Sequence, residues 1–181
     1  MTEADIDAVS AVRVRGWQAA YRGLLPQSHL DAMSAAEDAE DRRSWFGRRP
    51  PEMCDLVAEH DGEVIGWICV GPARDPDLAP GPEVSAASVT GPAAGEVFAL
   101  YVAPEVIGTG VGRALLAAGS ARARANGFRT LYLWVIRGNH RARRFYERAG
   151  FVPDGAEEAY EVDGSSVPEV RYRRALGPGP G

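Results

Sequence analysis

Three glycines at alternating positions, Gly108, Gly110 and Gly112, form the segment of the chain best suited to binding a ligand. They lie between a strand-like and a helix-like stretch, so side chains are absent where the backbone must turn tightly and approach another group. Amide N–H groups in such a loop surround an anion, and the start of the next helix adds a partial positive charge. Alternating glycines also serve tight turns and close helix packing, so the loop alone does not establish a phosphate site.

Residues around the loop restrict which phosphate ligand it suits. The chain contains no lysine, which excludes a Walker-type phosphate loop and Schiff-base chemistry. A dinucleotide fingerprint requires glycine at position 113, which is Arg113, and no acidic residue ends the next strand to hold a ribose. Coenzyme A is a pyrophosphate ligand that needs neither device. Four arginines offer it additional cations, although such arginines are more often simply solvated: Arg113, Arg141, Arg143 and Arg144.

The overall composition indicates one compact domain and excludes several classes of protein. The chain has 181 residues, of which 45% are hydrophobic. It has neither an apolar run of about 18 residues nor a leader peptide pattern, so we expect a cytoplasmic protein without a membrane partner. A net charge of −5 gives no basic surface for nucleic acid and mildly favours a cationic small molecule or basic peptide. Cys54, Cys69 and the three scattered histidines show no metal-ligand spacing, so we expect no metal site and inert, buried thiols.

The periodicity of apolar residues predicts the elements that position the loop. Helices are expected at 5–20, after Leu25-Pro26 with Ser28 as its cap, and at 36–46, 113–125 and 139–149. Strands are expected at 55–59, 63–70, 96–102, 131–136, 152–162 and 167–174, with Asp61-Gly62 and Asp163-Gly164 as turns. The run from 96 to 136 favours a right-handed parallel crossover. We expect one domain over 1–175, with a flexible excursion at 71–95 and a disordered tail at 176–181.

Two linked segments resemble motifs of the GNAT superfamily of N-acyltransferases. The stretch from Leu100 to Leu116 is similar to its acyl-CoA loop, and 139–151 is similar to its N-x-x-A-x-x-F-Y-E-x-x-G-F segment. Looser similarity covers 17–26 and 169–172, so the resemblance spans most of the chain. It implies an α/β (α+β) fold in which helices flank a mixed, mostly antiparallel sheet. In that family the sheet is splayed between its fourth and fifth strands, here 96–102 and 131–136, where the pantetheine arm inserts.

This sequence departs from the family pattern at two places. Ile107 stands where the family usually has Gln or Arg, so we expect the phosphates to be held mainly by backbone amides and with weaker affinity. The family also usually opens with a strand, whereas this chain reaches a helical pattern by Asp5. Either the first edge strand is short or missing, or the true start of the protein lies upstream. A missing strand would leave a sheet edge open to contact with a second copy, a homodimer.

The resemblance implies that the protein transfers an acetyl group from acetyl-CoA to the primary amine of a small molecule or peptide. Tyr146 is then the general acid for the leaving thiolate, and Glu96 the base that deprotonates the amine through water. The competing interpretation of Tyr146 is an aromatic contact in the core. That of Glu96 is a solvated acidic residue at the start of a strand. A non-catalytic acyl-CoA-binding or sensing module and a structural interaction domain are the alternative functions, and retention of both residues favours catalysis.

The resemblance also implies a set of ligand contacts. Backbone N–H groups near Tyr101 and Val102 are expected to polarise the thioester carbonyl. The remaining expected cofactor contacts are Ile107, Gly108, Thr109, Gly110, Val111, Gly112, Arg113, Asn139 and Ala142. Asn139 has a competing role as a helix N-cap. Trp17, Tyr21, His29 and Trp45 are candidates for the acceptor pocket, with ordinary core packing as the alternative.

Overall fold

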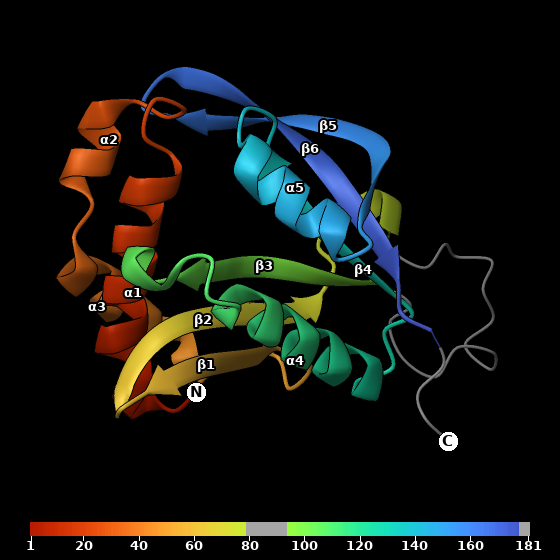
Figure 1. Cartoon of the computed structure of the whole chain (residues 1–181), viewed down its shortest axis with the longest axis horizontal. Coiled ribbons are helices and arrows are strands. Elements are labelled where there is room, and N and C mark those ends of the chain that lie inside the picture. Colours follow the sequence, from red (N-terminus) through yellow and green to blue (C-terminus); the bar gives the residue numbers. More distant parts are fainter. Residues whose placement is uncertain (79–93, 178–181) are drawn as a thin grey trace.

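A six-stranded sheet with strand order β1-β2-β3-β4-β6-β5 organises the computed structural model, which describes residues 1–78 and 94–177. The strands are β1 Cys54–His60, β2 Glu63–Pro72, β3 Ala94–Val102, β4 Thr130–Ile136, β5 Val152–Val162 and β6 Ser165–Ala175. The helices are α1 Ile6–Ala20, α2 Gln27–Ala32, α3 Ala35–Phe46, α4 Val111–Ala125 and α5 His140–Arg148. Short 3₁₀ turns occupy Glu3–Asp5, Pro76–Leu78 and Pro104–Val106. Figure 1 shows the hairpin β5–β6 at one end of the sheet and β1–β2 at the other.

The pairing of the strands confirms the predicted mixed, mostly antiparallel sheet. All neighbouring pairs are antiparallel except β3 and β4, which run parallel. Both predicted hairpin turns form. Asp61 and Gly62 have φ of 51° and 82°, and Asp163 and Gly164 have φ of 46° and 73°. Two successive residues at positive φ match the twist of the flanking strands, which explains why Asp-Gly pairs stand there.

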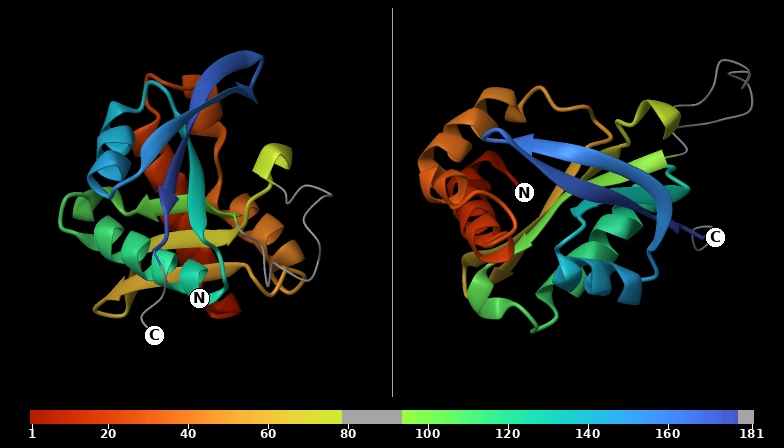
Figure 2. Two further views of the ribbon diagram at one scale, coloured as in Figure 1. Left: turned by 90° about the vertical axis from the view of Figure 1, so that its right-hand side faces the viewer. Right: turned by 90° about the horizontal axis from the view of Figure 1, so that it is seen from above.

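Helices cover both faces of the sheet, as the view from above in Figure 2 shows. On one face, α4 and α5 pack on a core cluster that includes Ile68, Leu131 and Tyr172. Gly119 of α4 allows close packing there, because an added Cβ would lie 2.8 Å from Ile68. On the other face, Val9 of α1 packs with residues of β2, and α1 and α3 cover the sheet. The two faces therefore have separate cores, divided by the sheet.

Several predicted boundaries need correction. Ser28 lies inside α2, whose N-cap is Pro26. The next helix, α3, is capped by Ser34, which accepts the N–H of Glu37 at 3.3 Å. The predicted excursion at 71–95 is too wide, because its first two residues end β2 and its last two begin β3. Most of it, 79–93, lies outside the described residues, so its flexibility stays a prediction. Leu176 belongs to the core rather than the tail, since it is buried and its N–H binds the carbonyl of Arg129 at 2.7 Å. Residues 178–181 also lie outside the described part.

The N-terminal region agrees with the expected departure from the family pattern. Within the described residues, the chain opens with a 3₁₀ turn and α1, and its first strand is β1. The strands that correspond to the family's fourth and fifth are therefore β3 and β4. No helix in the described part of the chain has the length and apolar character needed to cross a membrane.

Candidate active site

An opening between β3 and β4 is the first component of the site. The two strands pair at only three positions, the last of which joins Glu96 to Tyr132. Beyond Glu96 they diverge toward the left of Figure 1. The ladder between β2 and β3 skips Phe98, and such a bulge bends its strand and increases the twist. After Glu96, the edge of β3 that faces β4 therefore has backbone groups without a ladder partner, and the predicted splay is confirmed.

The glycine loop forms a cradle of free amides at the start of α4. Gly108 and Gly110 have φ of 94° and 103°, values that residues other than glycine rarely adopt. Gly110 is the N-cap of α4, and the first N–H to bond back to it is that of Ala114, at 3.0 Å. The N–H groups of the intervening first turn therefore point out of the helix without an intrahelical partner. This geometry suits a phosphate, which the positive end of the helix dipole also favours.

Side chains around the cradle divide into those that face the core and those that face outward. Val111 packs against the core beside Val102, and an added Cβ on Gly112 would lie 3.7 Å from Phe145. Thr109 turns its hydroxyl back to donate to the carbonyl of Val106 at 2.7 Å, so this side chain belongs to the turn. Arg113 is exposed at the mouth of the loop. The half-buried Ile107 offers no polar group, which leaves the amides and Arg113 as the donors.

Tyr146 lies on α5, which lies in front of the opening in Figure 1. Its ring packs edge-on against Phe145 and Phe151, with centroid distances of 5.1 and 5.8 Å. Its hydroxyl makes no hydrogen bond to any other described residue. Burial raises the pKa of Tyr146 well above its usual value, and the neighbouring Tyr101 adds to the effect. The phenol therefore keeps its proton near neutral pH, and the raised pKa makes it a weaker acid than an exposed tyrosine.

Asn139 performs the capping role that was one of its two interpretations. Its side-chain oxygen accepts the N–H of Ala142 at 3.1 Å at the start of α5, and the residue is only 9% exposed. Ala142 is half-buried against the same core as Tyr146. The cap fixes the start of α5 and with it the position of Tyr146. A direct contact of Asn139 or Ala142 with a ligand stays a prediction.

Aromatic side chains meet on the other side of the opening. Trp17 contacts Tyr21 edge-on at 4.9 Å and lies 6.2 Å from His29 and 6.3 Å from Tyr160. The hydroxyls of Tyr21 and Tyr101 are 3.3 Å apart. The ring of Tyr101 thus faces α1, and only its backbone lies along the opening. Three of the four predicted acceptor residues are brought together, whereas Trp45 lies on α3 in a different cavity.

Glu96 is placed at the start of the opening but is not free. It is 4% exposed, so the prediction of a solvated strand start is wrong. Its carboxylate accepts two hydrogen bonds from the guanidinium of Arg74, at 2.9 and 3.4 Å, and one from the backbone N–H of Arg74 at 3.2 Å. Arg74 thus occupies most of the acceptor positions of this carboxylate.

Comparison with known proteins agrees with this geometry. The family model described as "Acetyltransferase (GNAT) family" matches residues 17–151. The chain belongs to the GNAT family. It is 39% identical over 130 residues to a mycothiol acetyltransferase of Cellulomonas flavigena, covering 70% of this chain and 33% of that protein. It is 28% identical over 167 residues to the uncharacterized N-acetyltransferase YuaI of Bacillus subtilis, covering 92% and 85%. The chain thus spans about a third of the first relative and most of the second.

Among solved structures, a ribosomal-protein-alanine N-acetyltransferase of Brucella melitensis has the same fold. The two chains superpose with a TM-score of 0.72 at 25% identity, and the match covers 97% of each. The similarity extends over both halves of the sheet and both helical layers. The GNAT fold of this chain is therefore established over nearly its whole length.

Glu169, on β6 of this GNAT domain, is a candidate that the sequence did not single out. It pairs with Ile136 across the β4–β6 ladder and with Glu158 across the β5–β6 ladder. Its side chain is half-buried and has no hydrogen bond or ion pair among the described residues. Burial raises the pKa of Glu169 to about 7, and the charge of Glu158 adds to the effect. The alternation of side chains along β6 places Glu169 on the same face of the sheet as Ile136. The sequence pattern gives this face, but it does not give the residues that lie opposite.

Proposed function

We propose that the protein is an N-acetyltransferase that transfers an acetyl group from acetyl-CoA to the primary amine of a small molecule or peptide. The observation that carries this proposal is the opening between β3 and β4, with the free amides of 110–113 at one end and Tyr146 beside it. The cradle fits a pyrophosphate, because its amides converge at a helix start where no side chain intrudes. The unpaired edge of β3 offers amides to an extended, amide-containing arm.

The chemistry assigns roles to groups on both sides of the opening. The amine nitrogen must be neutral to form its bond to the acetyl carbon, and an alkylamine with a pKa of about 10.4 is mostly protonated at pH 7. A carboxylate accepts the amine proton, and the carbon–sulfur bond breaks as the carbon–nitrogen bond forms. Tyr146 then gives its proton to the departing sulfur. Glu96 and Glu169 are the two carboxylates available as base.

The named relatives support acetyl transfer but not one acceptor. One is named for a small molecule, mycothiol, and another for the alanine of a ribosomal protein. The chain covers only a third of the mycothiol acetyltransferase, so that acceptor does not transfer by similarity. A primary amine, on a small molecule or a peptide, is the description that fits both.

One observation favours the alternative of a non-catalytic acyl-CoA sensor. Arg74 binds the carboxylate of Glu96, which in a catalyst has to be free at some stage. A sensor keeps the cradle and has no use for a base. Glu169 weighs against this alternative, because it is a half-buried carboxylate that no described cation neutralises. The two functions differ in whether any amine releases free thiol from acetyl-CoA.

Thermal denaturation with acetyl-CoA tests the binding step. At 100 times its Kd a ligand stabilises by about 2.7 kcal/mol, which corresponds to roughly 5–10 °C for a domain of this size. We expect a shift of that order with acetyl-CoA. No shift at any concentration contradicts the proposal. A shift without thiol release from a broad panel of primary amines supports the sensor instead.

Substitution of Tyr146 by phenylalanine tests the catalytic step. Because only the hydroxyl is lost, we expect kcat to fall by about 100-fold while the acetyl-CoA shift stays within about twofold in affinity. Steady-state thiol release with an active amine measures this. Tyr132→Phe removes a hydroxyl from the neighbouring strand and is expected to keep its activity. Equal rates in wild type and Tyr146→Phe would remove this phenol from the mechanism.

A further inference from the structure

A cavity of about 710 Å³, separate from the opening between β3 and β4, lies between α3 and the sheet face of β2 and β3. Its floor includes Trp67 of β2 and Phe98 and Ala99 of β3. The bulge at Phe98 explains why two successive β3 residues face the same cavity. A volume of this size accommodates a small organic molecule, and aromatic rings in the floor favour one with a flat apolar part.

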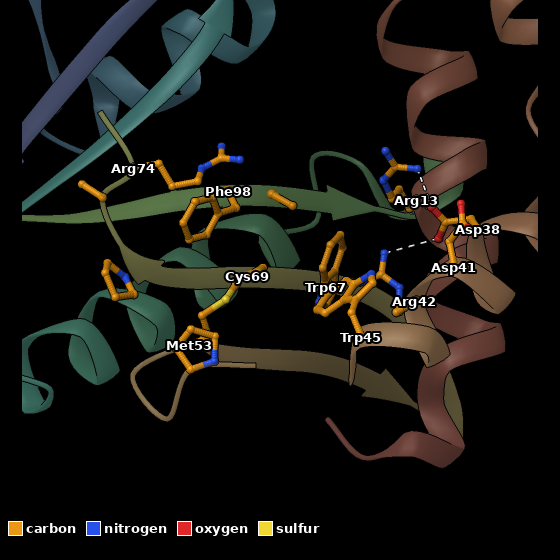
Figure 3. A pocket seen from close by; sticks show the side chains of 14 residues that line it. Arg13, Asp38, Asp41, Arg42, Trp45, Met53, Trp67, Cys69, Arg74 and Phe98 are labelled. Carbon is orange, nitrogen blue, oxygen red and sulfur yellow. Dashed lines mark hydrogen bonds and ion pairs between the residues drawn. The ribbon is translucent and has the colours of Figure 1, made fainter. Parts of the chain in front are cut away.

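Arg42 is the most unusual residue of this cavity. It is only 4% exposed, and its guanidinium lies over the ring of Trp67 at 4.3 Å. Its Nε makes no hydrogen bond to any described residue. An unpaired donor on a buried charged group is costly, and an incoming oxygen would satisfy it. Figure 3 shows Arg42 beside Trp67 and Trp45 at one end of the cavity.

Charge in the cavity is also incompletely balanced at this end. Arg13 and Arg42 share the single carboxylate of Asp38, at 2.5 and 3.3 Å. Asp41, the other carboxylate of the lining, is exposed and forms no ion pair with any described residue. The buried Arg42 and the partly exposed Arg13 thus share one carboxylate of the lining. An anionic group with a fixed geometry, such as a carboxylate, suits the free edge of Arg42.

Arg74 connects the other end of the cavity to the opening in the sheet. Its guanidinium stacks on Phe98 at 4.5 Å and binds Glu96 at 2.9 Å. The side chain is 72% exposed, so little packing holds it there. A second carboxylate entering the cavity would compete with Glu96 for this guanidinium. Figure 3 shows Arg74 and Phe98 together at the end opposite Arg42.

We propose that this cavity receives the acetyl acceptor, and that the acceptor is an amine that also carries a carboxylate and an aromatic or other flat apolar group. The carboxylate binds Arg42, the apolar group lies on Trp67 and Phe98, and the amine points toward Glu96 and the opening. The assignment of an acceptor rests on the proposed acetyl transfer, whereas the binding of such a molecule does not.

Isothermal titration calorimetry without acetyl-CoA tests the pocket with three probes. L-Phenylalanine carries all three groups, phenethylamine lacks the carboxylate, and 3-phenylpropanoate lacks the amine. We expect L-phenylalanine to bind at least about tenfold more tightly than phenethylamine, the effect of a hydrogen bond to a charged group. 3-Phenylpropanoate should compete with it. Equal or tighter binding of phenethylamine would overturn the proposal.

Two variants and a control locate the binding. Arg42→Gln is expected to weaken L-phenylalanine by at least about tenfold, whereas Arg43→Gln, on the exposed side of the same helix, should leave it unchanged. If Arg42→Gln does not fold by circular dichroism, Arg42→Lys decides, because it keeps the positive charge but lacks the Nε donor, and a loss of about fivefold is expected. Unchanged binding in the folded variant rejects the pocket.

Turnover then separates the two proposals. Acetylation of amines that lack a carboxylate, with no binding of L-phenylalanine, refutes only the pocket. Binding of L-phenylalanine with no turnover on any amine refutes only the proposed acetyl transfer.

Discussion

At the scale of single residues, two carboxylates compete for the role of base, and their surroundings differ. Glu96 is buried, and Arg74 donates three hydrogen bonds to its carboxylate. Glu169 is half-buried, has no bound cation among the described residues, and faces Glu158. Desolvation and the like charge both disfavour its ionised form, which explains a pKa of about 7. A base with a pKa near the working pH is the more effective one.

Glu169→Gln tests this assignment through the pH dependence of kcat/KM. A base must be deprotonated in the free enzyme, so activity that depends on Glu169 rises as the pH passes through about 7. We expect the variant to lose this limb and to fall by about 100-fold at pH 8. Glu158→Gln is the informative companion, because removing its charge should lower the pKa of Glu169 and move the limb to lower pH. A limb that Glu169→Gln leaves in place would assign the base to Glu96.

At the scale of elements, Arg171 fixes the turn that follows β2 onto the far half of the sheet. Its guanidinium, 6% exposed, binds Asp75 at 2.8 Å, Asp77 at 2.7 Å and Asp154 at 2.8 Å. Asp75 also accepts the indole N–H of Trp134 at 3.0 Å. These contacts join residues nearly a hundred positions apart and bridge β2, β4, β5 and β6. Because Arg74 precedes Asp75 directly, the same cluster positions the arginine that binds Glu96.

Arg171→Met should therefore destabilise the domain strongly. The substitution keeps the apolar volume but leaves three carboxylates near one another without a cation, and loss of a buried partner costs about 3–5 kcal/mol. Urea denaturation at pH 7 measures this, with the exposed Arg173→Met on the same strand as control. Arg171 lowers the pKa of Asp77, and such a group stabilises the fold above that pKa. The difference in the free energy of unfolding between wild type and Arg171→Met should thus shrink as the pH falls through the pKa of Asp77. A loss below about 1 kcal/mol would show that the cluster contributes little.

At the scale of the whole molecule, local sequence patterns predicted most of the architecture. Two Asp-Gly pairs specified hairpins, because both residues of such a turn need positive φ. The glycine loop between a strand and a helix, with the segment that ends in Tyr146, predicted the parallel pair β3 and β4. The cap of the short α2 was predicted wrongly, since six residues give too little periodicity to place the N-cap at Pro26 rather than at Ser28.

Contacts between distant residues were beyond these patterns. Nothing near Glu96 in the chain indicates that Arg74 binds it, because 22 residues separate them and their meeting depends on the β2–β3 register. The same holds for Glu169, whose cross-strand neighbours Ile136 and Glu158 lie on β4 and β5. Sequence periodicity assigns a residue to a face of a strand, but the groups on the opposing elements decide its charge and its hydrogen bonds.

The weak connection between the two halves of the sheet leads to a prediction for acetyl-CoA. β3 and β4 share only three paired positions, so the exposed edge of β3 at 97–102 should exchange its amide protons readily in the free protein. If the arm of acetyl-CoA enters the opening, its amides bind this edge and the phosphates bind the loop at 108–113. Hydrogen exchange measured by mass spectrometry should then slow in both segments. Exchange at the distant β1–β2 turn, at Asp61 and Gly62, should stay the same and serves as the internal control. Protection confined to 108–113 would mean that the protein binds the phosphates without admitting the arm, and that the opening in the sheet is not where the acetyl group is presented.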